Sequence, residues 1–224
     1  MVGKVTYLNY QGLQEGKLLN DLTELYCQLW EYDPNFGEYL KCPICNKYYS
    51  HEWYLLNKTV IKSPCCNSEL IPAWPRSTTR QMILQQSMDS TFVGFILIDD
   101  NLVQGFSWGM VFWNYEMDNR FGQGTYSQIF SANKDALGCF YLKELGVSRL
   151  VQGNGYGKGL VKAVFSETKR LYPSYTSALT THPLSKSVGI YTKIGFRYIG
   201  DIPKVPDRVA YGIPKVSEIQ LDGM

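Results

Sequence analysis

This 224-residue sequence has almost no excess of positive or negative charge. Its 22 lysines and arginines are balanced by 20 acidic residues, and no basic run reaches five residues. A protein that binds nucleic acid usually carries a basic stripe on its surface. The charge balance therefore argues against a nucleic-acid partner.

Long hydrophobic stretches are also missing. The longest apolar run, residues 92–98, is far too short to span a bilayer, and residues 1–10 lack the apolar core of a secretory signal. We therefore expect a cytoplasmic protein with no membrane partner. Apolar residues still make up 45% of the chain, which suffices for one substantial domain, with or without a small module.

Cysteine is scarce outside one short segment, because four of the six cysteines fall within residues 42–66. In a reducing compartment this clustering favours a metal site over disulfides. The surrounding residues 34–75 contain five prolines and no long periodic stretch, which predicts an inserted module. Cys27 and Cys139 lie in a predicted helix and a predicted strand, and we expect them in the core.

The cysteine segment resembles a zinc ribbon. Residues 41–46 (KCPICN) are echoed by residues 62–67 (KSPCCN), in which Ser63 replaces the expected third cysteine. Paired cysteines at this separation are a standard arrangement for structural zinc. The candidate metal ligands are Cys42, Cys45, Cys65 and Cys66. His51 is the alternative to Cys65 as a ligand, and a degenerate site with four buried thiols is the alternative to metal binding.

Hydrophobic periodicity predicts a mixed α/β protein. The predicted strands are residues 4–10, 92–98, 102–112, 137–147, 176–181, 196–200 and 208–214. The predicted helices are residues 18–30, residues 78–88 with Ser77 or Thr78 as the cap, the segment after the glycines to about residue 172, and residues 185–193. Residues 99–101 suit a tight hairpin turn, and residues 113–134 are predicted to form a long loop.

Glycine occupies every second position from Gly153 to Gly159, between a predicted strand and a predicted helix. Glycine lets the backbone turn sharply, and the free amides of a helix N-terminus bind phosphate groups. The spacing breaks the dinucleotide fingerprint, and no Gly-Lys-Ser/Thr completes a Walker A loop. A flexible connector is the remaining alternative to a phosphate site.

Two segments carry a resemblance to a known family. Residues 152–157 (QGNGYG) fit the Gln/Arg-x-x-Gly-x-Gly/Ala motif of the GNAT acetyltransferases, and residues 190–196 (IYTKIGF) are similar to the recurrent LYEKLGF segment of that family. The motifs lie about 35 residues apart, as in the family, and the predicted strand order agrees over residues 78–214. The resemblance implies the GNAT acyl-CoA N-acyltransferase fold for residues 1–33 and 76–224, with residues 34–75 as a zinc-ribbon-like insertion between the first two predicted helices.

The resemblance also implies roles for individual residues. Backbone amides of the glycine segment would hold the pyrophosphate of acetyl-CoA, and Val147 with its neighbours would pair with the pantetheine arm. The implied cofactor-binding residues are Val147, Gln152, Gly153, Asn154, Gly155, Tyr156, Gly157 and Lys158. The hydroxyl of Tyr191 would protonate the leaving thiolate, with a structural aromatic residue as the alternative. Many members carry Asn where this chain has Leu184, so the hydrogen bonds of that Asn do not transfer.

Two residues are candidates for the base that deprotonates the acceptor amine. Glu144 is the only carboxylate on the implied fourth strand, but it points away from the cofactor if Tyr141, Lys143 and Leu145 face it. An exposed structural glutamate is the alternative. His182, at the end of the fifth strand, is the second candidate, and a surface or capping histidine before Pro183 is the alternative.

Three functions agree with these patterns. The first is an N-acetyltransferase that moves the acetyl group of acetyl-CoA to a small-molecule or peptidyl primary amine by direct attack in a ternary complex. The second is a catalytically silent acyl-CoA-binding module, and the third is a zinc-ribbon interaction protein. The cysteine module is expected to shape acceptor recognition. The aromatic segment of residues 113–134 is open to interpretation as an acceptor wall, a lid or a homodimer contact.

Overall fold

The strands and helices predicted above occur in the same order in the computed structural model, together with short elements that were not predicted. The structure describes residues 3–14, 16–33, 37–57, 62–134, 136–204 and 207–222. The strands are β1 (Lys4–Leu8), β2 (Leu40–Lys41), β3 (Tyr48–Tyr49), β4 (Ile71–Pro72), β5 (Val93–Asp99), β6 (Leu102–Phe112), β7 (Cys139–Val147), β8 (Thr176–Thr181), β9 (Arg197–Asp201) and β10 (Val209–Ile213). The α-helices are α1 (Tyr10–Gln14), α2 (Lys17–Glu31), α3 (His51–Leu56), α4 (Arg76–Ser87), α5 (Asn114–Phe121), α6 (Ser127–Ala132), α7 (Tyr156–Leu171) and α8 (Val188–Lys193). Two short 3₁₀ turns, η1 (Arg149–Val151) and η2 (Val216–Glu218), complete the order.

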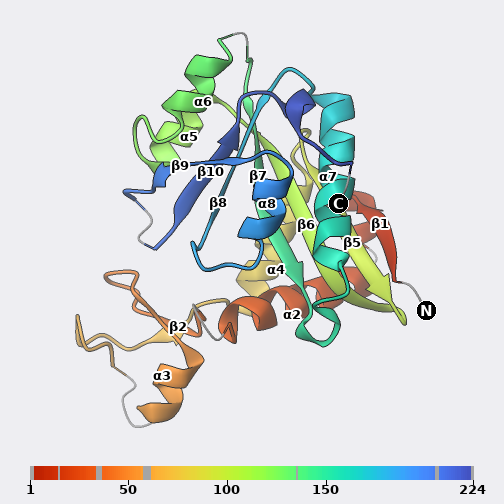
Figure 1. The fold of residues 1–224 in the computed structure, drawn as a ribbon. Helices are drawn as coiled ribbons and strands as arrows, with labels where there is room; N and C mark the ends of the chain where they lie inside the picture. Colours follow the sequence, from red (N-terminus) through yellow and green to blue (C-terminus); the bar gives the residue numbers. More distant parts are fainter. Residues whose placement is uncertain are drawn as a thin grey trace. The chain divides into compact units, whose positions relative to one another are not determined.

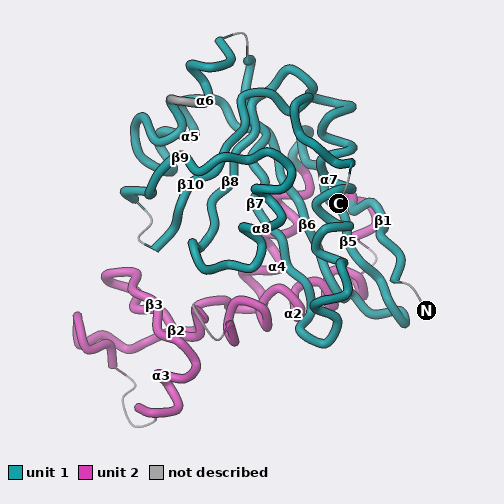
Figure 2. The backbone as a smooth tube through the Cα atoms, in the orientation of Figure 1, with its two compact units in different colours: residues 1–8, 89–224 teal, residues 9–88 magenta. Residues whose placement is uncertain are grey.

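The chain divides into two compact units, coloured separately in Figure 2. The larger unit comprises residues 1–8 and 89–224, and the smaller unit comprises residues 9–88. The cysteine segment therefore shares a unit with α2 and α4. Residues 34–36 and 58–61 of the predicted insertion lie outside the described residues, and its boundaries at residues 34 and 75 stay a prediction.

The larger unit is built on a seven-stranded mixed sheet in the order β1-β5-β6-β7-β8-β10-β9. Neighbouring strands are antiparallel except β7 and β8, which run parallel. The predicted hairpin between β5 and β6 turns at Asp100 and Asn101, whose φ angles are 49° and 61°. Asp and Asn tolerate this left-handed conformation better than other side chains, so the turn follows from the local sequence.

Helix α7 packs on one face of this sheet against β5, β6 and β7 (Figure 1). Its apolar residues recur at helical spacing, and Val161, Val164 and Phe165 are completely buried. These side chains meet Phe140 of β7 and Leu179 of β8 in one core cluster. Burying each such side chain stabilises the fold by about 1.5–3 kcal/mol, so α7 is held firmly against the sheet.

The predicted loop over residues 113–134 is wrong, because the segment forms α5 and α6. Met117 and Phe121, four residues apart, are buried and lie on one face of α5. The ring of Phe121 lies 5.0 Å from that of Tyr141 on β7, and Tyr126, also buried, donates a hydrogen bond to the carbonyl of Leu179. Phe121 and Tyr126 are thus core residues, whereas Trp113 and Tyr115 are exposed.

In the smaller unit, α2 packs against α4. Helix α4 begins at Arg76, with Pro75 as the N-cap residue, so the predicted caps Ser77 and Thr78 are wrong. Pro75 fixes the extended backbone before the helix, and its carbonyl accepts the first helical hydrogen bond from Thr79. In the described part of the chain, no helix is long and apolar enough to cross a membrane.

Candidate functional site

The parallel strands β7 and β8 pair over only part of their lengths. Their register matches residues 139–142 of β7 with residues 176–179 of β8. Beyond this stretch β7 stays paired with β6 to Val147, while β8 stays paired with β10 to Thr181. The two strands therefore separate at a fork, which is bridged at its base by a 2.7 Å hydrogen bond between the hydroxyls of Tyr141 and Thr180.

A β-bulge in β7 lies at this fork. Leu142 is opposite Gly109 and Glu144 is opposite Trp108, so Lys143 is the extra residue. A Cβ atom at Gly109 would lie 2.4 Å from the carbonyl oxygen of Tyr141, so only glycine allows this close approach. Glycine within a strand pattern is a known signal of a bulge, and it was the signal available in the sequence.

The bulge changes which side chains share a face. Simple alternation would place Leu145 with Tyr141 and Lys143, but Leu145 packs against the same core cluster as Leu142. The alternation assumed for Glu144 from the sequence therefore fails at this position. The hydroxyl of Ser107 donates to the carbonyl of Glu144 at 3.0 Å and stabilises the displaced backbone.

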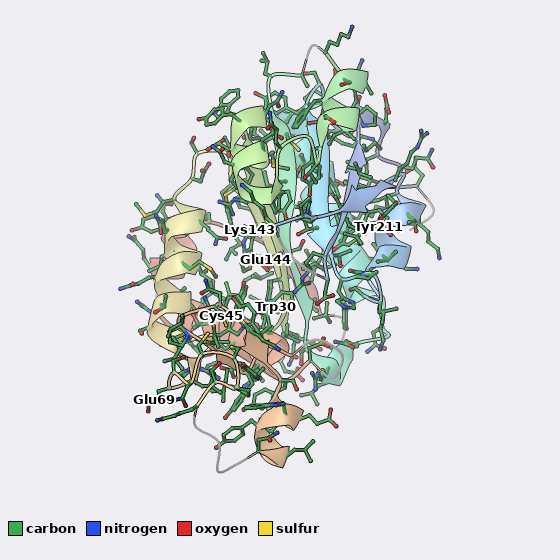
Figure 3. The ribbon with its side chains drawn as sticks, turned by 90° about the vertical axis from the view of Figure 1, so that its left-hand side faces the viewer. Trp30, Cys45, Glu69, Lys143, Glu144 and Tyr211 are labelled. Carbon is green, nitrogen blue, oxygen red and sulfur yellow. The ribbon has the colours of Figure 1, made fainter. Side chains whose placement is uncertain are left out.

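Lys143 and Glu144 lie side by side near the middle of the sheet in Figure 3. Burial lowers the pKa of Lys143, and the charge of Glu144 partly offsets this. The charge of Glu144 also raises the pKa of Tyr191, although burial is the larger cause there. The charge of Glu144 therefore acts on both Lys143 and Tyr191.

The glycine segment connects the end of β7 to the start of α7. Gly153 and Gly155 have φ angles of 90° and 80°, and no atom lies within 4 Å of a Cβ built at either residue. The side-chain amide of Gln152 donates to the carbonyl of Val147 at 3.0 Å, and that of Asn154 donates to the carbonyl of Val151 at 3.2 Å. These bonds hold the loop in place, and the backbone at Gly153 and Gly155 stays accessible to a ligand.

The first turn of α7 provides the positive end of a 16-residue helix. Its leading amides have no partner within the helix, and the helix dipole favours an anion there. Tyr156 and Gly157 begin this turn, followed by the exposed Lys158. The glycine segment is therefore followed by a helix N-terminus, as predicted, and phosphate binding there stays a prediction.

Helix α8 adjoins the same turn. A Cβ atom at Gly157 would lie 3.5 Å from Cδ1 of Ile190 and 3.8 Å from Cγ2 of Val147. The end of β7, the start of α7 and the side chain of Ile190 on α8 therefore meet at Gly157. Tyr191 follows Ile190, is only 5% exposed, and has its pKa raised to about 12, chiefly by burial. Its phenol is thus protonated at neutral pH.

His182 lies directly after β8, as the sequence predicted. Its Nδ1 atom accepts a 3.2 Å hydrogen bond from the backbone N–H of Leu184. This contact stabilises the turn that precedes α8, which agrees with the capping alternative. A catalytic role for His182 stays a prediction.

The smaller unit brings the four candidate metal ligands together. The sulfur atoms of Cys42, Cys45, Cys65 and Cys66 all lie within 4.8 Å of one another. The His51 ring lies instead among tyrosines, 4.8 Å from the ring centroids of both Tyr32 and Tyr39. The four-cysteine set is therefore the group that can hold a metal ion in the described residues, and His51 is not part of it.

Hydrogen bonds shift the pKa values of two of these thiols in opposite directions. The backbone N–H of Cys45, with the hydroxyls of Ser63 and Ser68, lowers the pKa of Cys42 to about 5. The pKa of Cys66 is raised to about 12, first by its contact with Cys45. All six cysteines are unbridged, and Cys27 and Cys139 are buried, as expected for core residues.

No protein-family model and no curated protein matches the sequence. Among solved structures, the fold is similar to that of PaiA N-acetyltransferase from Thermoplasma acidophilum in complex with coenzyme A, at a TM-score of 0.55 and 13% identity over 95% of this chain and 98% of that one. It is also similar to a GNAT superfamily phosphinothricin acetyltransferase from Sinorhizobium meliloti in complex with acetyl-CoA, at a TM-score of 0.53 and 12% identity, covering 96% and 89% of the two chains. A third similar structure is aminoglycoside 6′-acetyltransferase type Ii, at a TM-score of 0.53 and 13% identity, covering 95% and 97%. The chain therefore has the GNAT acyl-CoA N-acyltransferase fold.

Proposed function

We propose that the protein is an N-acetyltransferase that binds acetyl-CoA at the fork between β7 and β8 and transfers the acetyl group to a primary amine. The observation that carries the proposal is the convergence of three features: the separated strands, the open glycine loop at the N-terminus of α7, and the buried Tyr191 on the adjoining α8. The crystallised neighbours with coenzyme A or acetyl-CoA support this cosubstrate.

The cosubstrate would be held by backbone groups. Amides from Gln152 to Lys158 would bind the pyrophosphate, because they lie at the positive end of α7. Residues 143–147 of β7, which leave β8 at the fork, would pair with the amide-containing pantetheine arm. No side-chain charge of the loop is required for either contact, so binding would depend on backbone geometry.

The acetyl group would move by direct attack within a ternary complex. The amine must lose its proton before it attacks the thioester carbon, and the C–S bond then breaks as the new C–N bond forms. We assign the proton donor for the leaving sulfur to Tyr191, because its phenol keeps its proton at neutral pH. Glu144 is our first candidate for the base, since its charge reaches the environment of Tyr191, and His182 is the second.

The acceptor is proposed to be a small-molecule or peptidyl amine. The decisive experiment measures thiol release from acetyl-CoA against a library of amines, on the purified full chain. Turnover that requires an amine supports the transferase. Stabilisation by CoA without thiol release would instead support a silent acyl-CoA-binding module. If CoA has no effect and chelation abolishes binding of a protein partner, the zinc-ribbon interaction protein is favoured.

A further inference from the structure

Two turns in the smaller unit have the same hydrogen-bond pattern. In the first, the N–H of Cys42 donates to the carbonyl of Lys47 at 2.9 Å, and the N–H of Asn46 donates back to the carbonyl of Cys42 at 3.0 Å. In the second, the N–H of Ser63 donates to the carbonyl of Ser68 at 2.7 Å, and the N–H of Asn67 donates to the carbonyl of Ser63 at 2.8 Å. The turns are therefore equivalent, residue by residue.

The left-handed residues confirm this equivalence. Asn46 has a φ angle of 59° and Asn67 has one of 52°, at the same place in each turn. Ser63 thus corresponds to Cys42, and Cys66 corresponds to Cys45. Cys65 corresponds to Ile44, which holds no ligand position in the first turn.

Cys65 nevertheless contributes its sulfur to the cluster. Its Sγ atom lies 3.0 Å from that of Cys45 and 2.8 Å from the hydroxyl oxygen of Ser63. Ser63 is only 2% exposed, so its hydroxyl is held beside the sulfurs and not in solvent. The position that lacks a cysteine is therefore occupied by a hydroxyl that contacts the replacement sulfur.

Two further hydroxyls lie beside sulfur atoms of the four-cysteine cluster. The oxygen of Tyr49 lies 3.4 Å from the sulfur of Cys65, and that of Ser68 lies 3.2 Å from the sulfur of Cys42. A hydroxyl that donates to a thiolate spreads its negative charge and orients it. This arrangement suits ionised thiols that ligate a metal ion.

We propose that Cys42, Cys45, Cys65 and Cys66 bind one structural zinc ion, with Cys65 as the fourth ligand in place of Ser63. Four thiolates in a compact group suit tetrahedral zinc, in which Zn–S bonds of about 2.3 Å put sulfurs about 3.8 Å apart. Ser63, Tyr49 and Ser68 act as hydrogen-bond donors to the bound thiolates. Each thiol that ligates the ion releases its proton on binding.

The small core of this segment explains why a metal is needed. Its buried apolar cluster consists of Cys42, Tyr49 and Leu70, and its strands β2, β3 and β4 are two residues long. A core of this size does not offset the entropy lost when the segment becomes ordered. A zinc ion that joins the two turns supplies the missing stabilisation.

The first test measures metal content and ligand type on the full chain. The purified protein is expected to contain one zinc ion per chain, and its cobalt-substituted form should show the absorption of a tetrahedral tetrathiolate site. Cys65→Ser should lose the bound zinc and the tetrathiolate spectrum. Cys27→Ala, which removes a buried cysteine of the same unit outside the cluster, should keep both.

The second test moves the ligand. Ser63→Cys combined with Cys65→Ser places a cysteine at the position equivalent to Cys42, and zinc binding should return. Ser68→Ala, which removes only a donor, should keep zinc but bind it roughly 10-fold more weakly. The double variant also separates loss of a ligand from misfolding, because it retains Cys65→Ser.

Three results would overturn the proposal. The first is a wild-type protein in which all four thiols react freely and no zinc is found. The second is a Cys65→Ser variant that keeps full zinc and a tetrathiolate spectrum. The third is a double variant that stays metal-free. An iron-loaded wild-type protein would overturn the choice of zinc. None of these measurements uses acetyl-CoA, so the metal site and the proposed acetyl transfer can fail separately.

Discussion

Gly155 and Gly124 have nearly the same φ angle at separate points of the larger unit. Their φ angles are 80° and 79°, and a Cβ at either would meet no atom within 4 Å. Only Gly155 belongs to the loop proposed to bind the CoA phosphates. Comparing alanine substitutions at these two glycines therefore distinguishes destabilisation by backbone strain from loss of contact with the ligand.

Gly155→Ala and Gly124→Ala are expected to destabilise the protein equally, by about 1 kcal/mol, because both force alanine into the left-handed region. Only Gly155→Ala should weaken CoA binding, by roughly 10-fold or more, since its methyl group fills the space into which the phosphate fits. Calorimetric titration with CoA measures the affinity, and thermal unfolding measures the strain. Equal CoA affinity in the two variants would argue against a phosphate site in this loop.

Tyr191→Phe is expected to lower kcat by roughly 100-fold or more while leaving the KM for acetyl-CoA nearly unchanged, since it removes only the proton donor. The matched control is Tyr198→Phe, whose exposed hydroxyl contacts Asp201 on β9, and it should keep full activity. Steady-state kinetics on the best acceptor amine measures both. Undiminished kcat in Tyr191→Phe would remove this residue from the mechanism.

The pH dependence of the same reaction follows from the raised pKa of Tyr191. With a pKa of about 12, against an ordinary value of about 10, the phenol keeps its proton throughout the range in which enzymes are assayed. Loss of activity by ionisation of Tyr191 should therefore begin only above about pH 10. An alkaline limb at lower pH that disappears in Tyr191→Phe would contradict the raised pKa.

At the scale of elements, α2 and α4 are joined by a partly buried ion pair. Arg76, at the start of α4, binds the carboxylate of Glu31, at the end of α2, and approaches Glu24 at 3.4 Å. The side chain of Glu31 is only 4% exposed, whereas that of Arg76 is 41% exposed. Removing Arg76 would leave a buried carboxylate without its main cation.

Arg76→Met is therefore expected to lower the free energy of unfolding by about 1–3 kcal/mol, a range that allows for the exposure of Arg76. Glu31→Leu added to Arg76→Met should restore most of this loss, because no buried charge remains. Lys17→Met, which breaks the exposed pair with Asp21, should change stability by less than about 0.5 kcal/mol. Chemical denaturation measures the free energy of unfolding of all three variants. An unchanged value in Arg76→Met would show that burial of Glu31 does not depend on its pair with Arg76.

The elements also show what the sequence could and could not predict. Strands β5 to β8 and helix α7 follow from local periodicity, and the glycine loop follows from residues 153–159, because each signal is contained in one segment. The bulge at Lys143 depends on pairing with β6, where Trp108 lies 35 residues away in the sequence, so strict alternation along β7 does not hold there. Helices α5 and α6 were not predicted, because Phe121 and the neighbouring Tyr126 pack on distant strands, and a local pattern does not reveal such contacts.

At the scale of the whole molecule, the larger unit and the cysteine segment of the smaller unit obtain their stability from different sources. The larger unit has a continuous apolar core over α7 and the sheet, whereas residues 37–57 and 62–72 of the smaller unit surround a small cluster and the proposed zinc ion. Removing the ion should therefore affect one part of the molecule selectively.

Chelation of zinc is expected to increase amide hydrogen exchange in residues 37–57 and 62–72 and to leave β5 to β8 protected. Exchange measured by mass spectrometry, with and without chelator, reports both segments in one sample. The Cys65→Ser variant should show the same pattern without chelator. Uniform loss of protection along the chain would mean that the two units unfold together.

The single parallel strand pair has a consequence for how the chain is connected. Antiparallel neighbours can be joined by a short turn, but parallel strands need a segment that runs back from the end of one strand to the start of the next. Between β7 and β8, that segment contains α7. The start of α7 must then lie at the end of β7, whatever residues form the loop between them. A circular permutation that opens the chain at Asn154 and links residue 222 to residue 3 should therefore keep every strand pair while interrupting the loop, so that folding survives and affinity for CoA is lost.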